Sequence, residues 1–271
     1  MSELLLNTTS FWVAKEVKPW LLATFGMLGL LLVCLVAGQF DGRTLYGVSV
    51  WSKPSKFALS LAIYFATLIW IAPYIGREFF NRTIGQVLVW LPVVCAALEM
   101  AYIMLQASLG QPSHFNTSTA FHAAMYSLMG IGAVALVGVL VLYALVIIHR
   151  NSMMDPMVLA IVLGLGMTFA LGGGFGSYLG SSDGHWVNAP ATDAGGSLFF
   201  GWSREGGDLR VAHFFGMHAM QAMPLFAYAI KAKWSALSKV VSVLVFAAVY
   251  SGFTVITFIQ ALAGHPFGVA L

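Results

Sequence analysis

The chain has 271 residues, of which 59% are hydrophobic and only 8% are charged, and its mean hydropathy is +0.86. A soluble domain carries about 25% charged residues, so this chain has too little charge to cover a water-facing surface. Its net charge of +3 is too small for a nucleic-acid-binding surface and fits the loop charges that orient membrane proteins. The composition predicts an integral membrane protein.

Seven apolar stretches are long enough to cross a bilayer, because about 20 helical residues span about 30 Å of hydrocarbon. They are continuous rather than alternating, which favours helices over the strands of a barrel. The stretches cover residues 19–38, 56–75, 84–108, 118–148, 156–180, 209–230 and 235–262. We therefore expect an all-α bundle of about seven helices, forming a single transmembrane domain over residues 1–271 with one long loop at 181–208.

Lysine and arginine are distributed unequally between the two sets of loops. Eight lie in the N-terminal segment and the even-numbered loops, at Lys15, Lys18, Arg77, Arg82, Arg150, Lys231, Lys233 and Lys239. Five lie in the odd-numbered loops, at Arg43, Lys53, Lys56, Arg204 and Arg210. Cytoplasmic loops carry the excess of positive charge, so we expect the N-terminus inside and the C-terminus outside.

The segments VSVWSKPSKF, QPSHFN and GGDLRVAHFFGMHAMQ resemble segments of bacterial membrane proteins, and this resemblance implies no particular activity. We expect the protein in the bacterial cytoplasmic (inner) membrane. The loops at 39–55, 109–117 and 181–208 would then face the periplasm.

Polar side chains concentrate in the half of the membrane next to these three loops. Ionisable groups inside a membrane are costly and are usually functional. Glu99, Tyr102 and Gln106 share one face of the third stretch, because they are spaced i, i+3 and i+7. The others are Lys53 and Lys56 at the second stretch, His122 and Tyr126 in the fourth, and His213, His218 and Gln221 in the sixth. This pattern predicts a polar site that opens outward.

Histidine and carboxylate side chains from several helices are typical of metal and cofactor sites in helix bundles. We expect a metal ion held by Glu99, His122 and His218, or a haem bound axially by His122 with His213 or His218. His213 and His218 point about 140° apart on an ideal helix, so one would be a ligand and the other would support it. Glu99 needs a buried partner, and we expect His122, His218 or a bound cation.

Around these ligands, Glu99 and Tyr102 are the expected catalytic groups. Gln106, Tyr126 and Gln221 would line the cofactor. Lys53 and Lys56 begin the second stretch, where the helix N–H groups add to their charge and could hold an anionic headgroup or a substrate phosphate or carboxylate. The partner would be a lipid-soluble or anionic small molecule. Alternatively, both lysines extend to the interface without a ligand.

The fifth stretch carries a stripe of small residues with a period of four: Gly164, Thr168, Gly172, Gly176 and Gly180. Such stripes let two helix backbones approach closely, and we expect helix packing here. The alternative is a flat cofactor lying against the stripe.

Two other classes of function fit the same polar residues. In a solute carrier or channel they would line a pathway, although polarity confined to one half of the membrane argues against a complete one. In a sensor or assembly factor they would bind a ligand without turnover. Each histidine could also be purely structural, bonded to a backbone carbonyl or a tyrosine.

Overall fold

The computed structural model describes residues 15–230 and 233–268, and these residues are mostly helical. Within them, six helices are long and apolar enough to cross a membrane. They cover Lys15–Phe40, Ser52–Ile75, Thr83–Ser108, Ala120–Arg150, Pro156–Gly180 and Ala236–Leu262. Their ends lie within a few residues of six predicted stretches, so those predictions are confirmed. The chain therefore has the features of an integral membrane protein in contact with lipid.

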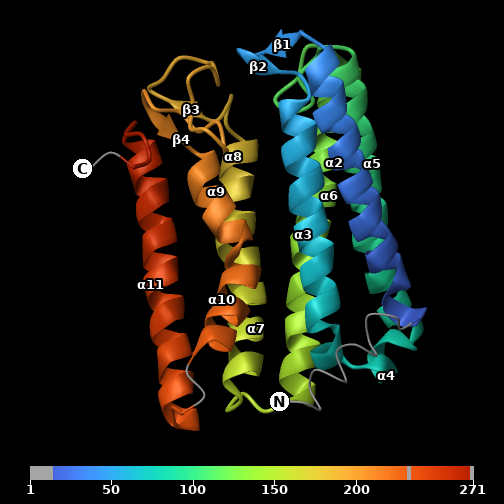
Figure 1. Cartoon of the computed structure of the whole chain (residues 1–271), viewed down its shortest axis with the longest axis vertical. Coiled ribbons are helices and arrows are strands. Elements are labelled where there is room, and N and C mark those ends of the chain that lie inside the picture. Colours follow the sequence, from blue (N-terminus) through green and yellow to red (C-terminus); the bar gives the residue numbers. More distant parts are fainter. Residues whose placement is uncertain (1–14, 231–232, 269–271) are drawn as a thin grey trace. The chain divides into compact units, whose positions relative to one another are not determined.

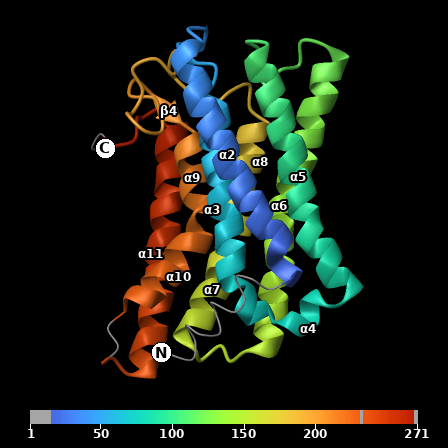
Figure 2. The same cartoon turned by 45° about the vertical axis from the view of Figure 1, so that its right-hand side comes forward.

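The chain divides into two compact units, Met1–Val139 (unit 1) and Leu140–Leu271 (unit 2), and the boundary lies inside helix α6 (Ala120–Arg150). Unit 1 contains η1 (Lys15–Val17), α2 (Lys18–Phe40), α3 (Ser52–Ile75), α4 (Arg77–Phe80), α5 (Thr83–Ser108) and the first part of α6 (Figures 1 and 2). Strands β1 (Thr44–Leu45) and β2 (Val48–Ser49) pair between α2 and α3. Tyr46 and Gly47 join the strands with φ of 54° and 80°, as a tight hairpin turn requires.

Two buried hydrogen bonds tie the helices of unit 1 together. The Trp20 indole donates to the Val89 carbonyl at 3.0 Å, which joins α2 to α5. The Tyr64 hydroxyl donates to the Leu136 carbonyl at 2.8 Å, which joins α3 to α6. Trp20 also packs edge-on against Phe80, with 5.5 Å between ring centroids. These contacts fix the helices whose other ends carry the polar residues.

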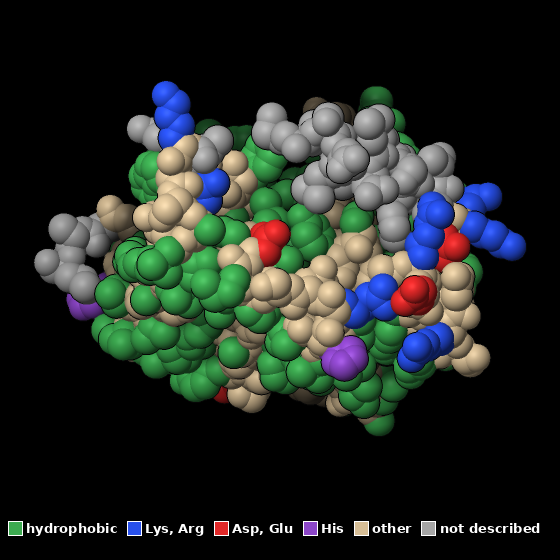
Figure 3. Space-filling view, turned by 90° about the horizontal axis from the view of Figure 1, so that it is seen from below, with side chains coloured by type: hydrophobic (Ala, Val, Ile, Leu, Met, Phe, Trp, Pro, Cys, Tyr) green, Lys and Arg blue, Asp and Glu red, His purple; other side chains and the backbone are tan. Residues whose placement is uncertain are grey.

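The helices of unit 1 also expose large apolar side chains. On α2, Leu22, Phe25 and Leu32 are 60%, 64% and 63% exposed. A water-soluble protein rarely leaves so much contiguous apolar surface uncovered, whereas lipid covers it without cost. Figure 3 shows Lys and Arg side chains standing out from a largely hydrophobic surface at the end of the molecule seen from below.

Unit 2 starts with the last part of α6, and its next helix changes its winding along its length. Asp155 caps α7 (Pro156–Met167) by accepting the N–H groups of Met157 and Val158. The helix continues as the π-helical segment η2 (Thr168–Gly173) and then as α8 (Gly174–Gly180). Strands β3 (Trp186–Val187) and β4 (Gly207–Asp208) pair across the long loop, and α11 (Ala236–Leu262) completes the unit.

The prediction of one uninterrupted helix over 209–230 is wrong. The structure has α9 (Arg210–Met217) and α10 (Ala219–Ala229), separated at His218, whose φ of −89° and ψ of 5° interrupt the helix. A break leaves backbone groups without helical partners. Thr168 accepts the N–H of Met220 at 2.9 Å and donates to the Met217 carbonyl at 3.4 Å. Hydropathy alone does not reveal such a break, because the residues on both sides are apolar.

The small-residue stripe packs against the broken helix, so the packing interpretation is confirmed. A Cβ atom added to Gly172 would lie 2.9 Å from the Met217 nitrogen, and one added to Gly164 would lie 2.9 Å from the Ala219 carbonyl oxygen. Conversely, a Cβ on Gly216 would lie 2.5 Å from the Gly172 nitrogen. The two backbones are in direct contact, so this part of the stripe has no room for a flat cofactor.

Candidate functional site

A polar cluster lies where α5 ends and α6 begins, at the end of unit 1 that also carries the β1–β2 hairpin. The Tyr102 hydroxyl lies 3.1 Å, and the Gln106 amide nitrogen 3.2 Å, from Nδ1 of His122. With the amide nitrogen of Gln106 facing the ring, Nδ1 accepts and the ring N–H lies at Nε2. Three of the predicted site residues therefore lie together, and His122 presents an N–H donor.

Glu99 lies deeper on the same face of α5. Its side chain is 8% exposed and makes no hydrogen bond within the described part of the chain. Its Oε1 atom lies 3.9 Å from Nε2 of His114. His114 therefore takes the place beside Glu99 that we expected for His122, which is bound to Tyr102 and Gln106 instead.

Sequence analysis did not select His114, because it belongs to the irregular loop before α6, where no helical periodicity marks its direction. Nδ1 of its ring lies 3.0 Å from the Ser113 hydroxyl. Burial lowers the pKa of His114 well below its usual range, and the nearby positive charge of Lys53 lowers it further. The ring is therefore neutral at neutral pH.

Aromatic side chains surround this polar cluster. The His114 ring centroid lies 5.4 Å from that of Phe57 and 5.9 Å from that of Tyr126, and Tyr126 lies 5.6 Å from Phe115. The Lys53 ammonium sits 5.8 Å above the centre of the Phe57 ring and also interacts electrostatically with Glu99. Lys53 thus belongs to the cluster, whereas Lys56 is exposed.

Gln106 is 1% exposed, and its Oε1 atom has no hydrogen-bond partner among the residues that the structure describes. More than 90% of buried polar groups in native proteins are paired, so each exception needs an explanation. Reversing the amide would leave the NH₂ group unpaired instead. One end of this side chain is therefore buried without a hydrogen-bond partner among the described residues.

In unit 2, His213 has the opposite hydrogen-bonding pattern to His122. Its Nδ1 atom lies 2.9 Å from the carbonyl oxygen of Gly172 in the π-helical segment. A carbonyl only accepts, so Nδ1 donates and the lone pair lies on Nε2, which has no hydrogen bond within the described residues. Gly176 makes space for the ring, since a Cβ there would lie 2.7 Å from its Cε1 atom.

His218 lies at the break between α9 and α10. Its Nδ1 atom is 3.2 Å from the Gln221 amide oxygen, and its ring centroid is 4.3 Å from that of Phe214. Nε2 of this ring is again left with the lone pair. The angle of 140° expected for His213 and His218 assumes a continuous helix and does not hold across the break.

The long loop of unit 2 is held to the start of α9 by a charged network. Arg210 donates to Asp193 at 2.8 Å and to Asp208 at 2.6 Å, and His185 donates to Asp193 at 3.1 Å. Burial raises the pKa of Asp193, but the hydrogen bond from His185 and the charge of Arg210 outweigh this and lower it to about 2. These contacts give the loop a defined fold.

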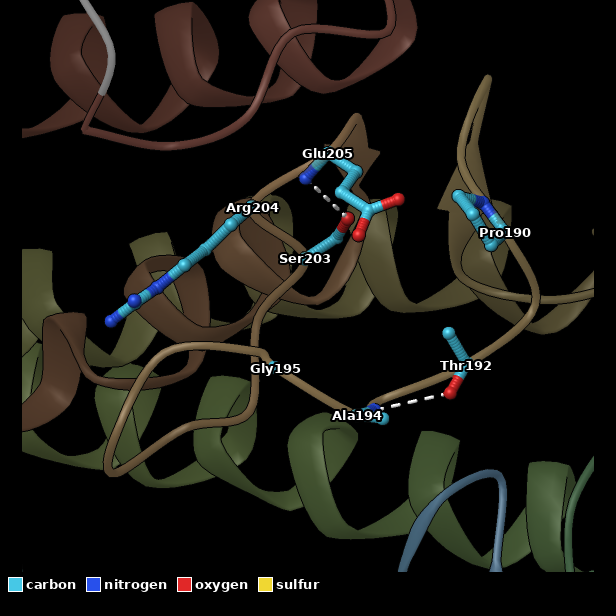
Figure 4. Close-up of a pocket in the computed structure, with 7 residues that line it drawn as sticks. All are labelled: Pro190, Thr192, Ala194, Gly195, Ser203, Arg204 and Glu205. Atoms are coloured by element: carbon cyan, nitrogen blue, oxygen red, sulfur yellow. Dashed lines mark hydrogen bonds between the residues drawn. The ribbon is translucent and has the colours of Figure 1, made fainter.

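A cavity of about 20 Å³ lies within this loop (Figure 4). It is lined by Pro190, Thr192, Ala194, Gly195, Ser203, Arg204 and Glu205. Thr192 accepts the Ala194 N–H at 3.1 Å and Ser203 accepts the Glu205 N–H at 3.3 Å. One water needs about 10–15 Å³, so the cavity holds about one water and no cofactor.

The predicted site residues therefore fall into two sets. Glu99, Tyr102, Gln106 and His122 lie in unit 1, and His213, His218 and Gln221 lie in unit 2. Residues 15–230 and 233–268 contain no group of three or more His, Cys, Asp and Glu side chains that could hold a metal ion. Comparisons with protein-family models, with characterised proteins and with solved structures find no match to this chain.

Proposed function

We propose that the chain is a seven-span protein of the bacterial inner membrane that uses a haem or a transition-metal ion in a redox or metal-dependent reaction. The two helices α9 and α10 together form the sixth of these spans, and α11 forms the seventh. The N-terminus lies in the cytoplasm and the C-terminus outside, and the polar clusters face the periplasm.

The observation that carries this proposal is the hydrogen bond from His213 to the Gly172 carbonyl. Histidines that bind metals almost always donate their second ring N–H to a carbonyl or carboxylate, which fixes the tautomer and directs the free nitrogen to the metal. His213 has this arrangement, and His218 has the same one through Gln221. A haem needs one or two axial ligands from the protein, so it does not require a cluster of three.

The test is the absorption spectrum and metal content of the protein, purified in detergent from cells supplied with iron and haem precursors. We expect a haem spectrum or a stoichiometric metal that is lost in His213→Gln. The matched control is His149→Gln, which changes an exposed histidine in the last turn of α6. A colourless wild-type preparation without stoichiometric metal would exclude the proposal.

A second function, a solute carrier, is favoured by the broken helix at His218. Transporters bind substrates where discontinuous helices expose backbone groups near the bilayer midplane. In this case solute flux into proteoliposomes would depend on Glu99 and on an intact break. Flux that Glu99→Gln abolishes, from protein without haem or metal, would rank the carrier first.

A further inference from the structure

The long loop of unit 2 presents two large apolar side chains at one turn. Leu198 is 93% exposed and Phe199 is 83% exposed, and together they are called the loop tip. On α11, whose apolar face meets lipid, Ile259 is 59% exposed. Residues 194–202, which contain the tip, have no charged side chain. Isolated apolar side chains are normal on a protein surface, but two neighbours on an uncharged segment form a patch that favours an apolar partner.

Hydrogen bonds close the turn that carries the loop tip. The N–H of Ser197 donates to the Trp202 carbonyl at 2.9 Å, and the N–H of Gly201 donates to the Ser197 carbonyl at 2.8 Å. The Trp202 N–H donates to the Ser197 hydroxyl oxygen at 3.0 Å, and Arg210 donates to the Gly201 carbonyl at 2.8 Å. Because these polar groups are already paired, moving the turn out of water does not leave them unsatisfied. The turn therefore presents its two apolar side chains in a defined conformation.

Aromatic contacts hold this turn against α9. The Phe200 ring stacks on Trp202, with 4.2 Å between centroids, and lies 4.8 Å from the ring of Phe214. Phe214 comes four residues after Arg210, where α9 begins, so it lies about one turn into the helix. The turn thus folds back beside the helix instead of extending away from it.

The same contacts relate the turn to the depth of the membrane. Trp202 lies 6.2 Å from the Phe215 ring, which lies 4.8 Å from the Phe253 ring on α11. The 27 residues of α11 make a helix about 40 Å long, so a centred helix extends about 5 Å beyond each side of a hydrocarbon core of about 30 Å. Phe253 stands nine residues, or about 14 Å, before the end of α11, which is hydrocarbon depth. The turn therefore packs where the helices enter the lipid.

Lipid fits the loop tip better than a protein partner does. A stable protein interface buries about 800 Å² and about 20–30 residues on each partner, whereas the tip consists of two residues. Leucine and phenylalanine side chains enter the hydrocarbon region favourably, and tryptophan is enriched at its boundary, where Trp202 would lie. The aromatic contacts also connect the turn to Phe253, which is 40% exposed on the apolar surface of α11.

We propose that Leu198 and Phe199 insert into the adjacent leaflet of the bilayer and so anchor the long loop to the lipid surface. The bilayer supplies the apolar surroundings that the described residues do not give these two side chains. Asp193 and Arg204 are the nearest charged residues before and after the uncharged segment, and they would stay at the level of the headgroups. A haem or metal is not required, because only the long loop of unit 2 is involved.

The test measures the surroundings of a fluorescent label on the loop tip. Phe199→Cys is labelled with the fluorophore NBD, and the full-length protein is placed in nanodiscs of phosphatidylcholine and phosphatidylglycerol, where both faces of the bilayer are open to solvent. Two quenchers are compared: aqueous iodide, and phosphatidylcholine with a nitroxide near the headgroup end of its acyl chain. We expect the nitroxide lipid to cause a large loss of fluorescence and iodide to cause little.

The matched control is Asp183→Cys, an exposed position of the same loop, where the two quenchers should act in the reverse order. The wild-type protein, treated with the same label, gives the background from Cys34 and Cys95. Leu198→Cys carries the label on the neighbouring tip residue if Phe199→Cys does not fold.

A charge on the tip tests the insertion itself. Adding Leu198→Asp to the labelled Phe199→Cys protein should withdraw the tip, because a carboxylate is costly to bury in lipid. Iodide quenching should then rise to the level of Asp183→Cys. Ala191→Asp adds the same charge to another exposed residue of the loop and should leave the quenching unchanged.

The lipid anchor is wrong under any of the following results. Equal iodide quenching of the Phe199→Cys and Asp183→Cys labels would place the tip in water. Protection of the tip label from both quenchers would mean that protein covers it, either another part of this chain or a partner. Equal nitroxide quenching of both labels, or unchanged quenching after Leu198→Asp, would mean that the two tip side chains are not what enters the lipid.

Discussion

Both units bury polar side chains among apolar helices, but the partners of these side chains differ. In unit 2, Thr168 and Tyr250 bond to the backbone groups released by the break between α9 and α10. In unit 1, the buried side chain of Glu99 makes no hydrogen bond, and Oε1 of Gln106 has no partner among the described residues. The polar side chains of unit 2 stabilise the broken helix. Those of unit 1 keep hydrogen-bonding capacity that the described residues do not use.

The largest effect should come from Gly216→Ala in unit 2. The added Cβ would meet the backbone of Gly172 at 2.5 Å, and a backbone cannot turn aside as a flexible side chain can. We expect a loss of about 3 kcal/mol in the free energy of unfolding, the upper part of the usual range for overpacking. Thermal melting in detergent measures it. Gly174→Ala is the control, because nothing lies within 4 Å of a Cβ there, and equal melting of both variants would contradict the contact.

Removing one tyrosine hydroxyl in each unit sharpens the comparison. The Tyr250 hydroxyl donates at 2.7 Å to the carbonyl of Phe215, which lies in the last turn of α9, so Tyr250→Phe removes the side-chain donor of a partly buried carbonyl at the helix break. We expect a loss of about 2 kcal/mol there. Tyr64→Phe should cost only about 1 kcal/mol, because the Leu136 carbonyl accepts a second hydrogen bond within α6. Chemical unfolding of both variants would show the difference, and the reverse order would refute this account of the break.

The sequence was sufficient to predict the long helices. An apolar run of about 20 residues in a membrane must form hydrogen bonds between its own backbone groups, and a helix does this. It also placed Tyr102, Gln106 and Glu99 on one face of α5, since that follows from helical periodicity alone. The spacing of small residues also predicted that a second helix would pack closely against Gly172, although it did not identify Gly216 as the partner. These features depend on neighbours within a single helix.

The features that the sequence missed depend on contacts between distant segments. His114 reaches Glu99 from an irregular loop, for which no periodicity gives a direction. The break at His218 is stabilised by Thr168, which is 50 residues away along the chain, so the residues of the sixth stretch alone do not reveal it. The contacts of Asp193 with His185 and Arg210 arise in the same way.

The smallest effect on global stability should come from Asp193→Asn, about 0.5 kcal/mol or less at neutral pH, because a loop can open while the helices stay packed. Its effect on the loop itself is larger and depends on pH. The folded pKa of Asp193 is about 2, below the ordinary value of about 3.9, so its contribution is complete above about pH 4 and is lost as the pH falls through 2.

Hydrogen exchange over residues 181–208 measures this, after correction for the intrinsic pH dependence of exchange. At pH 7 the loop of Asp193→Asn should exchange faster than that of the wild type, and the difference should shrink as the pH falls from about 4 to 2. Burial also lowers the pKa of His185, so protonation favours the open loop and wild-type protection should start to fall below about pH 6.5. Asp183→Asn, an exposed change in the same loop, should match the wild type throughout. A difference between Asp193→Asn and wild type that is as large at pH 2 as at pH 7 would mean that the carboxylate charge is not what holds the loop.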